Sequence, residues 1–97
     1  MAVTTQYKRG DRHIYRHVGG EHMLVSIHRD SVAPLFSLTS TGAVVWRALS
    51  DWATADMLVD ALTRDFEVGR AEAADDVTVF LDQLRQIGAL LVREVEA

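Results

Sequence analysis

The stretch that decides the fold reads Leu35-Phe36-Ser37-Leu38-Thr39-Ser40-Thr41-Gly42-Ala43-Val44-Val45-Trp46. Its first four residues fit a short β-strand of mainly apolar side chains. Thr39 or Ser40 can cap the helix that follows, because a hydroxyl oxygen there accepts from an amide left free in the first helical turn. Apolar residues then recur at helical spacing, at Val45, Trp46 and Leu49. The junction therefore predicts a strand, about residues 34–38, that runs directly into a helix.

A glycine pair upstream predicts a β-hairpin. Residues 13–18 and 21–28 flank Gly19-Gly20, and glycines supply the positive φ angles that a two-residue hairpin turn needs. Because side chains alternate across a strand, the apolar side chains of the hairpin share one face, which is the predicted core face: Ile14, Val18, Met23, Val25 and Ile27. The opposite face, predicted to be exposed, carries His13, Tyr15, His17, His22, Leu24 and His28.

Two further helices follow the junction helix. Thr54 can cap the second, whose apolar stripe is Met57, Leu58, Ala61, Leu62 and Phe66. The third covers residues 70–87 and ends at Gly88, where a helix favours a left-handed residue. Its stripe is Ala73, Val77, Phe80, Leu81, Leu84 and Ile87. These elements predict an α+β, winged helix-turn-helix-like fold, with a three-stranded antiparallel N-terminal sheet followed by three helices.

Composition narrows the class of protein. The chain has 97 residues, 48% of them hydrophobic, and contains no cysteine, so disulfides and thiolate sites are excluded. No stretch resembles a signal peptide or reaches membrane-spanning length, which predicts a cytoplasmic protein without a membrane partner. We expect one domain over residues 7–92, with flexible tails at 1–6 and 93–97.

The sequence offers little catalytic chemistry. It has no nucleophile motif, Walker loop or dinucleotide-binding turn, and we predict neither an enzyme nor a cofactor. Asp75 and Asp76 are adjacent on a helix, so their carboxylates diverge. His17 and His22 would face each other across the hairpin, but no third ligand has suitable spacing, so no metal site is predicted.

Charge bears on the DNA-binding alternative that a winged helix raises. The net charge is −4, with basic residues concentrated in the first half and acidic residues in the second. The third helix, which would read DNA, carries Glu72, Asp75, Asp76 and Asp82. Acidic side chains repel phosphates, so we expect no nucleic-acid partner, and a winged-helix regulator of DNA or protein remains the alternative.

Several motifs occur in an order and spacing that resemble those of the PqqD family, whose members are also called precursor-peptide recognition elements. They are Tyr7-Lys8-Arg9, Val18-Gly19-Gly20-Glu21, Leu38-Thr39-x-x-Gly42-x-x-Val45-Trp46-x-x-Leu49, Thr54 through Leu62, Phe66-Glu67-Val68, and Ala73-x-x-Asp76-Val77-x-x-Phe80-Leu81-x-x-Leu84-x-x-x-Gly88. The chain departs from the family pattern at Thr39, where asparagine is usual, and in the length of the loop at residues 29–33. The resemblance implies a non-catalytic peptide chaperone of natural product biosynthesis. Such a protein binds the leader of a ribosomally made precursor peptide and presents it to a radical-SAM protein, peptidase or cyclase.

A physical mechanism for that role follows from the third predicted strand. An edge strand exposes backbone donors and acceptors that an extended peptide can satisfy by strand addition. The third helix would form the other wall of the groove. The predicted peptide-binding residues are Leu35, Phe36, Ser37 and Leu38 from the strand and Asp76, Val79, Phe80 and Gln83 from the helix. Two registers remain open: either Phe36 and Leu38 or Leu35 and Ser37 line the groove. The same edge would let two copies pair as a homodimer.

Overall fold

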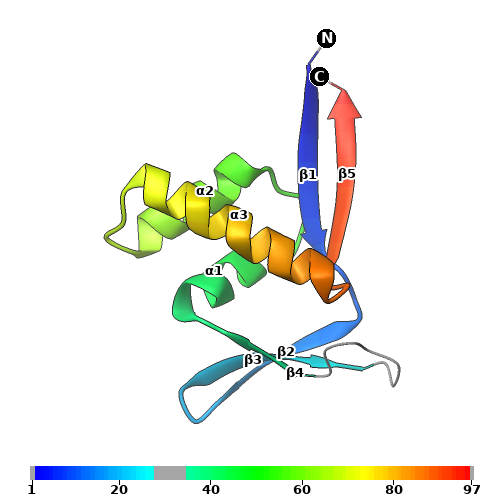
Figure 1. The fold of residues 1–97 in the computed structure, drawn as a ribbon, viewed down its shortest axis with the longest axis vertical. Helices are drawn as coiled ribbons and strands as arrows, with labels where there is room; N and C mark the ends of the chain where they lie inside the picture. Colours follow the sequence, from blue (N-terminus) through cyan, green and yellow to red (C-terminus); the bar gives the residue numbers. More distant parts are fainter. Residues whose placement is uncertain (1, 28–34, 97) are drawn as a thin grey trace.

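The computed structural model describes residues 2–27 and 35–96, and it folds them into two antiparallel sheets and a group of helices (Figure 1). The elements in chain order are β1 (Val3–Arg9), β2 (His13–Val18), β3 (Glu21–Ser26), β4 (Leu35–Leu38), α1 (Ser40–Ala48), α2 (Ala55–Asp65), α3 (Arg70–Gln86) and β5 (Leu90–Glu96). The predicted α+β class, with a three-stranded sheet ahead of three helices, is confirmed. Pro34, His28 and the loop at 29–33 lie outside the described residues.

The predicted hairpin forms with the predicted register. Gly19 and Gly20 have φ angles of 59° and 81°, the left-handed values that a tight hairpin turn requires. Val18 pairs with Glu21, and the ladder continues to His13 opposite Ser26. On its other side β3 pairs with β4, from His22 opposite Leu38 to Val25 opposite Leu35. The strand order is β2-β3-β4, so β4 is an edge strand.

The prediction of which face of this sheet packs on the core is wrong. Leu24 is fully buried and His13 is only 6% exposed, whereas Ile14 and Val18 are 42% and 63% exposed. The sheet therefore turns its histidine-rich face toward the helices. Three aromatic side chains on that face contact one another. The Tyr15 hydroxyl hydrogen-bonds to Nδ1 of His22, and the His22 ring stacks on that of His17.

Most of the apolar side chains on this face come from the neighbouring strand β4. Leu24 joins the core together with Leu38 of β4, and Phe36 packs against it. Alternation along β2 and β3 alone could not reveal this, because the face is completed by residues that are distant in the sequence.

The three helices begin and end close to the predicted residues. Thr39 Oγ1 accepts from the amide of Gly42 at 3.1 Å, and Thr54 Oγ1 accepts from that of Met57 at 3.2 Å. Gly88 closes α3 with a φ of 74°. Most of the predicted stripes are buried, but Met57 is 53% exposed, and Val59 takes a core position instead. Local capping signals and periodicity were sufficient to place these helices.

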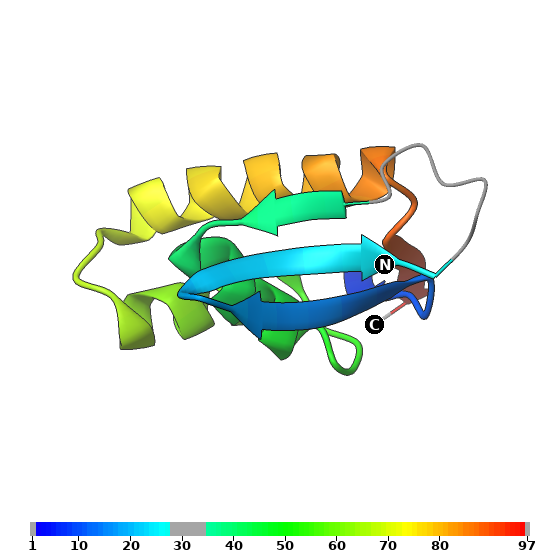
Figure 2. The same cartoon turned by 90° about the horizontal axis from the view of Figure 1, so that it is seen from below.

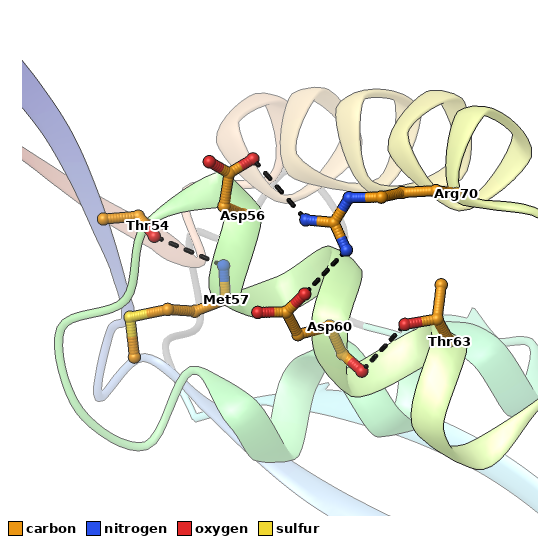
Figure 3. A network of polar contacts seen from close by, with 6 residues as sticks. All are labelled: Thr54, Asp56, Met57, Asp60, Thr63 and Arg70. Atoms are coloured by element: carbon orange, nitrogen blue, oxygen red, sulfur yellow. Dashed lines mark hydrogen bonds and ion pairs between the residues drawn. The ribbon is translucent and has the colours of Figure 1, made fainter.

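Arg70 ties the start of α3 to α2 (Figure 3). Its guanidinium donates to Asp60 at 2.7 Å and lies 4.0 Å from the carboxylate of Asp56. The hydrogen bond to Asp60 raises the pKa of Arg70 above its ordinary value. All three side chains are largely exposed, so we expect the network to contribute little to the stability of the fold.

The chain ends form a two-stranded ribbon in place of the flexible tails predicted at 1–6 and 93–97. β1 pairs with β5 from Val3 opposite Glu96 to Arg9 opposite Leu90, and the ribbon extends away from the helices (Figure 1). β1 is also held to the body, because Tyr7 and Ala53 exchange backbone hydrogen bonds of 2.8 and 2.9 Å. Each of these two strands finds its hydrogen-bonding partner at the other end of the sequence, so neither segment alone indicates that it forms a strand.

Within the described ranges, no helix combines the length and apolar character needed to span a membrane.

Candidate functional site

The backbone of β4 presents a free edge toward α3. Figure 2 shows β3 on one side of β4 and α3 along the other. In an antiparallel sheet, residues alternate between bonding one neighbour and the other. The two-residue turn makes Val18 and Glu21 a hydrogen-bonded pair, so on β3 it is His22 and Leu24 that bond toward β4.

The same alternation fixes which groups of β4 are available. His22 and Leu24 pair with Leu38 and Phe36, so the N–H and C=O groups of Leu35 and Ser37 point away from β3. Phe36 is half-buried and Leu38 is 8% exposed, while Leu35 and Ser37 are exposed on the outer face. Of the two registers left open by the sequence, this geometry favours Phe36 and Leu38 as the side chains on the groove side.

A cavity of about 270 Å³ lies beyond the end of β4, between the start of α1 and the middle of α3. It is lined by Thr39, Thr41, Gly42, Val45, Leu62, Asp76, Val79, Phe80 and Gln83. All four residues predicted from the third helix are therefore brought together in one pocket. The four predicted residues of β4 do not line this pocket. They precede Thr39, the first lining residue, along the chain.

The pocket has an apolar floor and a rim that combines apolar and acidic side chains. Val45 and Leu62 are almost completely buried and Phe80 is 8% exposed, so they form a hydrophobic base. Val79 is 58% exposed and Asp76 is exposed, both on α3. Such a lining suits an apolar side chain that enters from an extended peptide, with polar groups around its backbone.

Gly42 allows the two walls of this pocket to approach each other. A Cβ built on Gly42 would lie 3.1 Å from Cε1 of Phe80 and 3.3 Å from Oγ1 of Thr39. Both distances are tighter than ordinary contacts, so a larger residue would displace the ring that shapes the pocket. The lining also includes five residues that were not predicted as site residues from the sequence: Thr39, Thr41, Gly42, Val45 and Leu62. For Gly42, the sequence offered one signal of a close approach, which is a glycine in the first turn of a capped helix.

The histidines of the hairpin were the candidate metal ligands of the sequence. Across residues 2–27 and 35–96, no three side chains of histidine, aspartate and glutamate come together as a metal-binding group. His22 instead hydrogen-bonds to Tyr15 and stacks on His17.

Comparison with known families gives a match over most of the chain. The model described as coenzyme PQQ synthesis protein D (PqqD) matches residues 21–90, from the start of β3 to the start of β5. The chain belongs to the PqqD family. The PqqD match includes both walls of the candidate site, β4 and α3, and leaves out β1 and β2.

Among solved structures, the chain is similar to one described as TbiB1 in complex with the TbiA(β) leader peptide. The TM-score is 0.70 at 24% sequence identity, and the alignment covers 86% of this chain and 93% of the other. This likeness supports the PqqD-like fold. Comparison with curated proteins gives no match.

Proposed function

We propose that this PqqD-family protein captures the leader segment of a ribosomally made precursor peptide by β-strand addition to β4. The observation that carries the proposal is the free edge of β4 beside the pocket on α3. Membership of the family and the leader peptide bound by the structural neighbour both support this role. Neither comparison supports the DNA-binding alternative, which the exposed carboxylates of α3 also oppose.

Strand addition uses the backbone for affinity and the side chains for specificity. The outward N–H and C=O groups of Leu35 and Ser37 are the donors and acceptors that a peptide strand would pair with. Alternate peptide side chains would then point toward α3. One of them reaches the pocket beyond Leu38, where Phe80 and Val79 provide apolar contacts.

Charge adds a second element of selection. Asp76 lies at the pocket, and Glu72, one turn earlier on α3, is exposed on the same side of the helix. An acidic wall favours a leader that carries a basic residue near its apolar anchor and disfavours an acidic leader.

The proposal assigns no catalytic role to the chain. The protein binds the leader in the cytoplasm, where ribosomes make the precursor. It then presents the bound leader to a separate modifying enzyme of the radical-SAM, peptidase or cyclase class. The bound edge gives the enzyme an ordered leader, while the segment to be modified stays outside the groove.

Replacing Ser37 with proline tests the edge specifically. Proline removes an N–H that points away from β3, so it should leave the β3–β4 ladder intact while it blocks an incoming strand. We expect the affinity for a fluorescent peptide that carries the leader of a candidate precursor to fall by about tenfold or more. Titration by fluorescence anisotropy would measure this.

Ser37→Ala is the matched control, because it removes the exposed hydroxyl and keeps the N–H. It should bind the leader as the unmodified protein does. Equal affinities for the proline and alanine variants, with both proteins folded by circular dichroism, would contradict strand addition at β4.

A further inference from the structure

The outer face of the β2-β3-β4 sheet is largely apolar, and no other strand or helix that the structure describes covers it. Figure 2 looks onto this face, with α1 behind the sheet and α3 along the edge of β4. Ile14, Val25 and Leu35 form one row across the three strands, according to the pairing register. Ile14 is 42% exposed, Leu35 is 59% exposed and Val18, on the same face, is 63% exposed. A cluster of exposed apolar side chains on one sheet face marks an interaction surface.

Two opposite charges share this face. Arg16 follows Ile14 on β2 and Glu21 begins β3, and both side chains are exposed. Arg16 lies opposite Met23, so Glu21 is its diagonal neighbour on the same side of the sheet. In the part of the chain that the structure describes, neither side chain is in an ion pair.

We propose that this face binds the same face of a second copy of the chain. A twofold interface brings a single patch against itself, so residue i of one copy meets residue j of the other and the reverse. Arg16 and Glu21 supply such a complementary pair, and each dimer would contain it twice. The row of Ile14, Val25 and Leu35 would form the dry centre, because stacked sheets bury their facing apolar side chains.

This arrangement goes beyond the proposed peptide binding and is compatible with it. Dimerisation through the β4 edge would compete with the peptide for the groups of Leu35 and Ser37. Packing through the outer face leaves that edge open in both copies, because face and edge are perpendicular surfaces of the same strand. Two leaders could then be held side by side on one dimer.

Sedimentation velocity over a micromolar-to-millimolar concentration series tests the interface. We expect the unmodified protein to shift from monomer to dimer and Ile14→Lys to remain monomeric, because a lysine would be buried at the centre of the apolar row. Val3→Lys is the matched control, since Val3 is 55% exposed but lies on the distant ribbon. This variant should dimerise normally.

A charge exchange tests the symmetry. Arg16→Glu should weaken the dimer by about tenfold, because two ion pairs become repulsive contacts. Adding Glu21→Arg to the same chain should restore dimerisation, since the reversed pair is again complementary across the twofold axis. A double variant as weak as the single one would contradict the proposed packing.

Other results would overturn the proposal outright. An unmodified protein that stays monomeric at millimolar concentration would leave this face to a different protein. A dimer unaffected by Ile14→Lys would form through another surface, such as a strand edge. Leader binding by Ile14→Lys separates the two proposals: it should be retained if the leader uses β4, whatever the oligomeric state.

Discussion

Truncation of Leu24 to alanine should lower the free energy of unfolding by about 2–5 kcal/mol. Leu24 is fully buried, and it packs in the core with Leu38 of β4 and Trp46 of α1. Its removal would leave a cavity at the point where the sheet meets the helices. Since domains of this size are stabilised by about 5–15 kcal/mol in total, the loss would be a large part of the stability.

Val25→Ala is the matched comparison, because Val25 is the next residue on β3 and points to the outer face. It is partly exposed, so we expect a loss of less than about 1 kcal/mol in dilute protein. Urea denaturation followed by circular dichroism measures both variants. A larger loss for Val25→Ala than for Leu24→Ala would mean that the sheet faces the other way.

The elements marked by local chemistry could be predicted from the sequence. Thr39 and Thr54 cap their helices because a threonine hydroxyl three residues ahead of an amide is a local arrangement. The Gly19-Gly20 turn fixed the hairpin register for a similar reason. On α3, the helical periodicity places Phe80 on the core stripe and Val79 beside it. The residues of α3 that line the candidate site could therefore be predicted from the sequence.

The features that sequence reasoning missed depend on distant partners. The orientation of the hairpin could not be deduced, because its more apolar face is the exposed one and Leu24 is buried by residues of β4 and α1. The ribbon required pairing of residues 3–9 with residues 90–96. The depth of the pocket depends on the close approach of Gly42 to Phe80, which lies far along the chain.

Val79→Asp should weaken leader binding by about 10- to 1000-fold. Truncating an anchoring contact costs about 1–4 kcal/mol, and here a second carboxylate also replaces an apolar contact beside Asp76. Because Val79 is 58% exposed, the substitution should leave the fold intact. Isothermal titration calorimetry with the leader peptide measures the affinity, and circular dichroism checks the fold.

Val3→Asp is the control for this substitution. Val3 has a similar exposed fraction, 55%, but lies on the ribbon remote from the pocket. It introduces the same charge into the protein without placing it at the proposed site. A leader that binds Val79→Asp as tightly as Val3→Asp would show that the pocket on α3 does not hold the anchor residue.

Backbone hydrogen exchange at β4 tests the central claim most directly. The amides of Leu35 and Ser37 point away from β3, so in the free protein they should exchange rapidly with solvent deuterium. If the leader adds as a strand, both amides become hydrogen-bonded, and saturation with the leader peptide should slow their exchange strongly in NMR spectra. Rapid exchange at Leu35 and Ser37 in the fully bound protein would contradict strand addition at this edge.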